Sequence, residues 1–239
     1  MKLLKARTCL LLIGVTTFVS AGAALAAQGN PGIAPINSNI NYVKTYGELG
    51  AEWWQWVVQV PAADNPLLDT TGDKCGMGQQ GPVWFLAGVS GTGGAARTCE
   101  VPGGKALFFP VVNVAFFAFP DDPPGQRTRE FLTEQLMFCD KNTLADVVVR
   151  IDGVPVAKAA HFWTSPDQSP LFQATLPTDN IFGADPGQLL SPSLQEGVYL
   201  YVKPLTTGTH TVAWTASWNC GAQDISYTLT VLPGVAGQE

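Results

Sequence analysis

The sequence predicts a mainly β fold with two helices, and three observations lead to this prediction. Gly and Pro contribute 25 and 18 of the 239 residues, whereas charged residues make up only 13%. Such a composition favours many short elements joined by turns. Several runs of strand length are rich in β-branched and aromatic residues, and two segments have helical spacing. We therefore expect a β-sandwich with an N-terminal amphipathic helix and a second short helix.

Residues 1–26 have the three-part pattern of a secretory signal peptide. A basic start at residues 2–7 precedes an apolar run at residues 9–19, and an Ala-x-Ala cleavage site ends at Ala26. The apolar run is too short to favour a stable membrane span. We therefore expect cleavage after Ala26 and a mature chain that is soluble and either secreted or periplasmic.

The charge of the mature chain excludes one class of partner. The signal peptide contains three of the 13 Lys and Arg residues and none of the 19 Asp and Glu residues, which leaves a formal charge of −9. Nucleic acid is therefore not expected as a partner. No later apolar run reaches spanning length without Pro, Gly or a charge, so no membrane span is expected after cleavage.

One compact domain is expected after the signal peptide. Residues 27–44 are rich in Gly, Pro, Asn and Ser, which is typical of an extended lead-in. Residues 45–239 are long enough for a single β-rich core. A sub-boundary near residues 141–146 is the alternative to one undivided domain.

The first helix is the best-defined local element. Thr45 and Glu48 fit a capping box, and Pro61 would stop a helix that runs from Tyr46 to Val60. Its apolar residues share one face, which predicts a core contact. The other face is predicted to be solvated or to form a site. Its polar stripe consists of Glu48, Glu52, Gln55 and Gln59.

The middle of the chain alternates between turn-rich and apolar segments. Turn residues without periodicity predict loops, and aromatic runs that are apolar on both faces predict strands buried on both sides. The expected elements are a long loop at 64–80, strands at 83–89, 105–112 and 114–119, a flexible turn at 91–94, and a helix at 128–139.

The last third of the chain has the clearest strand pattern. Asp152-Gly153 predicts a hairpin turn between strands at 147–151 and 154–157. Three further strands are expected at 197–202, 209–218 and 225–231. Period-two alternation places four residues of the second of these on one buried face. They are Val212, Trp214, Ala216 and Trp218.

Three segments of this region carry a resemblance. Residues 152–156 (Asp-Gly-Val-Pro-Val), 204–212 and 227–231 (Tyr-Thr-Leu-Thr-Val) resemble the immunoglobulin-like sandwich modules of exported bacterial proteins. The resemblance implies an immunoglobulin-like sandwich, with a jelly-roll-like arrangement as the alternative. It specifies fold and not activity. Residues 53–113 resemble no family whose function is known.

Four cysteines remain after cleavage, and they permit three pairings. We favour Cys75 with Cys99, because they bracket one hairpin unit. We favour Cys139 with Cys220, because this bond would tie the second helix to a late strand. The alternative is four buried free thiols.

Carboxylates are the main candidates for catalysis. Glycoside cleavage needs two of them in one cleft, and Glu52, Asp121 and Asp122 are the candidates. A solvated helix face is the alternative for Glu52. The histidines His161 and His210 lack metal-ligand spacing, so a zinc site is not expected.

An acidic loop is a weak candidate for calcium binding. Asp64, Asp69 and Asp73 could supply carboxylate ligands, but they do not follow the spacing of an EF-hand loop. No other cofactor is expected.

Aromatic residues point to a sugar-binding role. Trp54 lies away from the apolar stripe of the first helix, and an exposed Trp can stack on a sugar ring. A core position is the alternative. The candidate ligand-binding residues are Trp54, Asn113, His161 and Trp163.

Three functional hypotheses follow from these residues. The first is a non-catalytic module that binds a glycan or another extracellular polar ligand. The second is a polysaccharide hydrolase or lyase that uses paired carboxylates. The third is a structural surface protein.

Overall fold

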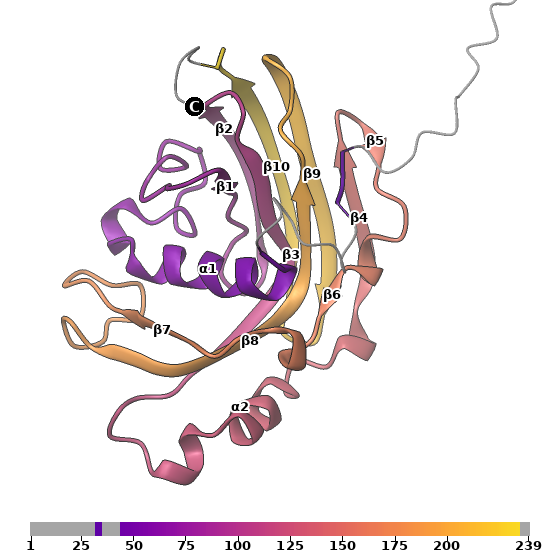
Figure 1. Ribbon diagram of the computed structural model, residues 1–239. Coiled ribbons are helices and arrows are strands. Elements are labelled where there is room, and N and C mark those ends of the chain that lie inside the picture. Colours follow the sequence, from indigo (N-terminus) through magenta and orange to yellow (C-terminus); the bar gives the residue numbers. More distant parts are fainter. Residues whose placement is uncertain (1–31, 35–43, 235–239) are drawn as a thin grey trace, which may run out of the picture.

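The computed structural model describes residues 32–34 and 44–234, and it has two packed β-sheets with two α-helices (Figure 1). The expected signal peptide and most of the expected lead-in lie outside the described residues. The helices are α1 (Tyr46–Gln59) and α2 (Arg129–Leu136), and the short 3-10 helices are η1 (Ala62–Asp64), η2 (Pro124–Arg127), η3 (Lys141–Thr143), η4 (Ala159–His161) and η5 (Pro166–Gln168). The strands are β1 (Val83–Phe85), β2 (Gly93–Val101), β3 (Ala106–Phe117), β4 (Ala145–Ile151), β5 (Val154–Pro155), β6 (Trp163–Thr164), β7 (Phe172–Thr175), β8 (Leu189–Val202), β9 (Gly208–Trp218) and β10 (Gly221–Val231).

Both sheets are open and mixed. The first has the order β1-β3-β8-β6, with β7 also paired to β8, and the second has the order β2-β10-β9-β4-β5. The pairs β1–β3 and β2–β10 are parallel, and the other pairs are antiparallel. The expected mainly β, sandwich-like architecture is therefore confirmed.

The molecule has three layers, because α1 packs on the outer face of the first sheet (Figure 1). In β8, Val198 and Leu200 point into the core between the sheets, whereas Tyr199 and Tyr201 point toward α1. A sheet that is covered on both faces needs strands that are apolar on both faces. This explains the continuous apolar runs in the sequence.

The core between the sheets contains the predicted face of β9. Val212, Trp214 and Ala216 are buried there, and Trp218 is half-buried beside them. The Trp214 ring stacks on Phe109 of β3 with 4.7 Å between the ring centroids. Alternation along one strand therefore identified the residues that join the two sheets.

Helix α1 begins at the predicted residue and ends one residue before the predicted end. The Thr45 amide donates to the Glu48 carboxylate at 2.6 Å, and the Glu48 amide donates to the Thr45 hydroxyl at 3.2 Å, which completes the capping box. The helix ends at Gln59, and Pro61 prevents its continuation. A Cβ atom at Gly47 would lie 1.8 Å from the carbonyl oxygen of Gln168, so a glycine is needed for this close packing.

Several strand predictions differ from the structure, and the expected strand at 83–89 is limited to Val83–Phe85. The two expected strands at 105–112 and 114–119 form one strand, β3, with a register shift between Pro110 and Val112. The expected turn at 91–94 includes the start of β2, because Gly93 and Gly94 pair with β10. Strand β8 begins at Leu189, before the expected start at residue 197. In β2, β3 and β8, pairing with a distant strand extends the element beyond its local signal.

Both predicted disulfides are present. Cys75 bonds to Cys99 and Cys139 bonds to Cys220, with Cα–Cα distances of 6.0 and 5.4 Å. Two such bonds indicate an oxidising, extracytoplasmic compartment. Within residues 32–34 and 44–234, no helix is long and apolar enough to cross a membrane.

Candidate functional site

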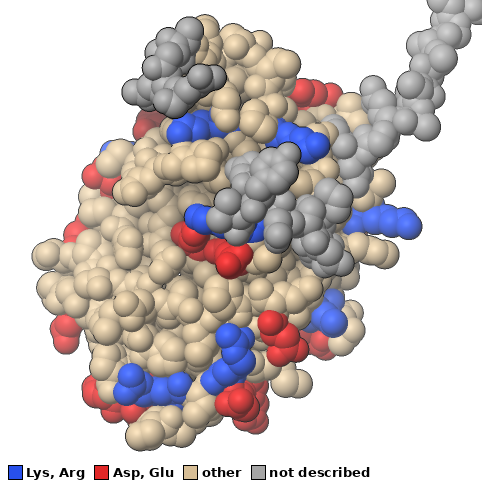
Figure 2. All heavy atoms as spheres, viewed as in Figure 1, with Lys and Arg blue, Asp and Glu red and all other residues tan. Residues whose placement is uncertain are grey.

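A cleft of about 560 Å³ lies between α1 and the loop that leads into β1. This volume is in the usual range for small-ligand sites. The face in Figure 2 has wide uncharged areas, with charged side chains scattered in small groups of both signs. The cleft is lined by Lys44, Leu49, Glu52, Gln55, Trp56, Gln59, Gly78, Gln80, Gly81, Pro82, Val83 and Phe85.

Helix α1 supplies the polar wall of the cleft. Glu52, Gln55 and Gln59 lie on one stripe of the helix, and all three line the cleft. Gln55 donates its amide hydrogen to the carbonyl of Gln173 in β7 at 2.8 Å, which fixes its orientation. The Gln59 side chain is exposed. This stripe is the face that the sequence left as either solvated surface or a site.

Aromatic side chains form the floor. Trp56 and Phe85 contact each other with ring centroids 5.5 Å apart, and each is less than a tenth exposed. The Trp56 indole N–H donates to the Met77 carbonyl at 2.8 Å. The floor is therefore bonded directly to the loop that forms the opposite wall.

That opposite wall is held in place by side-chain hydrogen bonds. The Gln79 amide exchanges two hydrogen bonds with the backbone of Phe85, at 2.9 and 2.8 Å, and it also donates to the Cys75 carbonyl. Lys105 donates to the carbonyl of Gly81. Gln80, between these anchors, is exposed and lines the cleft. The wall is thus preformed, and one amide side chain is left for a ligand.

The charges of the cleft are paired with each other. The Lys44 ammonium lies 2.5 Å from the Glu52 carboxylate, and the two side chains are 44% and 37% exposed. Such an exposed ion pair contributes little to stability. Glu52 is the only carboxylate among the described residues that line the cleft, so the cleft offers amides and aromatic surface and no pair of carboxylates.

The other two predicted catalytic residues lie elsewhere. Asp121 and Asp122 are in the turn that follows β3, and neither is among the residues that line the cleft. Asp122 accepts a hydrogen bond from the Phe119 amide at 2.7 Å, which stabilises that turn. The structure does not bring Glu52 together with these two aspartates in the cleft.

The predicted ligand-binding residues are dispersed. Trp54 packs edge-on against Trp53 and Phe117, with ring centroids 5.2 and 5.6 Å away. Among the other predicted ligand-binding residues, Asn113 is half-buried in β3, His161 is exposed in η4, and Trp163 is half-buried beside Trp218. The tryptophan that lines the cleft is Trp56, which helical spacing assigned to the core. Gln80 was missed because its segment has no periodicity.

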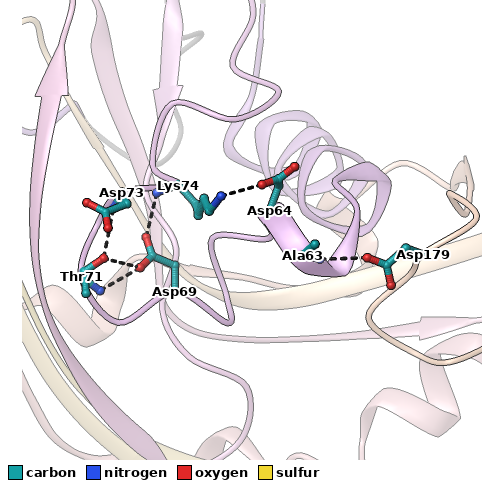
Figure 3. Close-up of polar contacts among 7 residues, drawn as sticks. All are labelled: Ala63, Asp64, Asp69, Thr71, Asp73, Lys74 and Asp179. Atoms are coloured by element: carbon teal, nitrogen blue, oxygen red, sulfur yellow. Dashed lines mark hydrogen bonds and ion pairs between the residues drawn. The ribbon is translucent and has the colours of Figure 1, made fainter.

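The acidic loop uses its carboxylates for internal bonds (Figure 3). Asp69 accepts hydrogen bonds from the Thr71, Gly72 and Lys74 amides at 2.8, 2.9 and 2.9 Å. Burial acts to raise the pKa of Asp69, but these bonds outweigh it and lower that pKa. Asp64 faces the Lys74 ammonium at 2.6 Å.

No metal centre is formed by the described residues. They contain no group of three or more His, Cys, Asp or Glu side chains that could hold a metal ion. In the acidic loop, the amide of Asp73 donates to the Thr71 hydroxyl at 3.3 Å, so this residue also takes part in the turn. The loop therefore has an evident structural role, which is to hold the segment that Cys75 ties to β2.

Comparison with protein families, curated proteins and solved structures finds no match to this chain. Functional conclusions therefore depend on the chemistry of the cleft.

Proposed function

We propose that the protein binds a neutral, hydroxyl-rich ligand, such as a segment of a glycan, in the cleft beside α1. The observation that carries this proposal is the combination of an aromatic floor with free amide groups in a preformed cleft. Binding without catalysis fits the presence of a single, ion-paired carboxylate.

Amide side chains suit hydroxyl groups because each amide can donate and accept hydrogen bonds. The side-chain amides of Gln59 and Gln80 form no hydrogen bond with residues 32–34 and 44–234. A sugar ring has an apolar face that can contact the exposed edges of Trp56 and Phe85. Since both rings are largely buried, the hydrogen bonds would supply most of the specificity.

A panel of soluble and insoluble neutral polysaccharides tests this proposal by co-sedimentation and calorimetry. The double variant Gln59→Ala/Gln80→Ala should bind about tenfold or more weakly, because each lost hydrogen bond costs about 0.5–1.5 kcal/mol. The matched control is Gln126→Ala, an exposed glutamine in η2 that lies outside the cleft. Equal binding by the wild type and the double variant would refute the proposal, as would no binding to any polymer.

The alternative is a polysaccharide hydrolase or lyase. Such an enzyme needs two carboxylates about 5 to 9 Å apart in one cleft. The ion pair of Glu52 with Lys44 makes this alternative less favourable at this cleft. New reducing or unsaturated ends in the same tubes, lost in Glu52→Gln, would support the enzyme over the binder.

We further propose that the two packed sheets form an immunoglobulin-like sandwich and that the protein is secreted or periplasmic. The antiparallel β9–β10 pair and its neighbour β4 support the first part. The two disulfides support the second.

A further inference from the structure

A second pocket, of about 400 Å³, lies beside α2 and contains a buried carboxyl group. One wall is formed by the turn after α2 and by η3, and the other is formed by β6 and η5. Glu196 of β8 lies between them. The pocket is lined by Met137, Cys139, Asp140, Lys141, Asn142, Trp163, Ser165, Pro166 and Glu196.

Glu196 occupies a position that an apolar residue would normally fill. It lies opposite Val114 of β3, and it shares a sheet face with Leu194 and Val198, which are fully buried. Glu196 itself is 7% exposed. None of residues 32–34 and 44–234 forms a hydrogen bond or an ion pair with its carboxyl group. An acidic group in a long apolar strand is thus left without a partner.

The other charged side chains that line the pocket do not satisfy this group. Asp140 accepts two hydrogen bonds from Asn142, both at 2.8 Å, and so completes its own turn. Lys141 attracts the Glu196 carboxylate from a distance but forms no ion pair with it. Burial raises the pKa of Glu196 to about 7, and the attraction of Lys141 offsets only part of this rise. Glu196 lines the pocket, so its carboxyl group can be reached only through the pocket, by water or by a ligand.

Both walls of the pocket are fixed by bonds outside it. The disulfide Cys139–Cys220 anchors the first wall to the turn between β9 and β10, and Asn219 of that turn donates to the Phe138 carbonyl at 2.6 Å. Arg129 of α2 donates to the carbonyls of Pro166 and Ser169 at 2.9 and 3.0 Å, which anchors the second wall. A preformed pocket loses little freedom when a ligand binds.

We propose that this pocket binds a small organic cation, a protonated amine with an apolar body, whose ammonium group pairs with the Glu196 carboxylate. The half-buried Trp163 and the Met137 side chain provide surface for the apolar body. An ammonium group gains a charge-assisted hydrogen bond from the carboxylate, and an aromatic face attracts it further. The two carboxylates and one ammonium of the lining leave one excess negative charge, which favours a cation over an anion.

The test uses the mature full chain with benzylamine, phenethylamine and hexylamine as probes at about pH 8, where these amines are protonated and the Glu196 carboxyl is ionised. Calorimetry should detect binding of at least one amine and no comparable binding of benzyl alcohol, which has a similar body without the charge. Glu196→Gln should weaken amine binding at least tenfold. Lys141→Gln should strengthen it about two- to threefold, because a repelling charge is removed.

The control is Glu130→Gln, which removes an exposed carboxylate of α2 outside the pocket and should leave binding unchanged. Far-ultraviolet circular dichroism checks that each variant is folded. If Glu196→Gln does not fold, weaker binding by Lys141→Gln than by the wild type would overturn the proposal. Equal affinity for benzylamine and benzyl alcohol, wild-type affinity in Glu196→Gln, or no binding of any of the three amines would also overturn it.

Discussion

Removal of each disulfide should destabilise the protein by an amount that follows the length of the loop it closes. The bonds Cys75–Cys99 and Cys139–Cys220 span 24 and 81 residues of sequence. In the chain-entropy treatment, a bond that closes a longer loop removes more freedom from the unfolded chain. For these two lengths it gives losses of about 3.4 and 4.5 kcal/mol. The pair Cys139→Ala/Cys220→Ala should therefore be the more destabilising by about 1 kcal/mol.

Packing losses should affect both pairs to a similar extent. Each disulfide has one buried cysteine, Cys99 or Cys139, and one that is half-buried. The two loops do not overlap in sequence, so the losses should add to about 8 kcal/mol, which is comparable to the whole stability of a typical domain. The chain without both disulfides is therefore expected to be largely unfolded.

Urea unfolding followed by tryptophan fluorescence measures these losses for the wild type and the two double variants. The linear extrapolation is valid for comparison if the slope against urea stays similar among the three proteins. A larger loss for Cys75→Ala/Cys99→Ala than for Cys139→Ala/Cys220→Ala would refute the loop-length argument. A loss below about 1 kcal/mol for either pair would refute it too.

Three further predictions concern buried and paired groups. Glu196→Gln should unfold at a higher urea concentration than the wild type at about pH 8 and show little difference at about pH 4. The folded pKa of Glu196 is raised from 4.5 to about 7, so the wild-type fold loses stability as the pH rises through this window, and the variant does not. Equal differences at both values would contradict this. The pKa of His210 is raised chiefly by its hydrogen bond to Asp152, at 2.7 Å. This pair therefore stabilises the fold fully below the unfolded pKa of about 6.5, and the stabilisation is lost as the pH rises through the folded pKa. Asp152→Asn should remove this pH dependence and lower the pKa of His210 in an NMR titration, and an unchanged titration would argue against the pair. Trp214→Ala should lower the free energy of unfolding by about 3–5 kcal/mol in the same urea assay, because the side chain is fully buried between the sheets. A loss below about 1 kcal/mol would contradict this and would mean that the core closes around the cavity.

Local signals identified the elements that depend on neighbouring residues. The capping box of Thr45 and Glu48 located the start of α1, and Pro61 located its end. Asp152-Gly153 located the turn between β4 and β5. Both turn residues have positive φ angles. These features depend on residues within a few positions of each other, so one sequence is enough to find them.

The candidate cleft was predicted in part. The polar stripe of α1 was recognised, and Glu52 was named as a site residue. The cleft residues Gln80 and Phe85 come from a segment that folds back onto α1, and no periodic pattern in the sequence links this segment to the helix. The Trp residues show the same limit, since helical spacing separates two faces but does not tell which neighbour covers each face. Trp54 therefore packs on Phe117, while Trp56 lines the cleft.

The sequence by itself determined the mainly β class, the two helices and the buried face of β9, and it favoured, among three possible pairings, the two disulfides that the structure contains. Only the tertiary structure decided that β2 pairs in parallel with β10, where Gly93 lies beside Gln223, and that Glu196 lies in a pocket between α2 and β6. The physical reason is the distance along the chain over which each interaction acts. Periodicity and capping act along a few residues of backbone, whereas parallel strand pairs and pockets join segments that are far apart in the chain, and their contacts exist only after the core has formed.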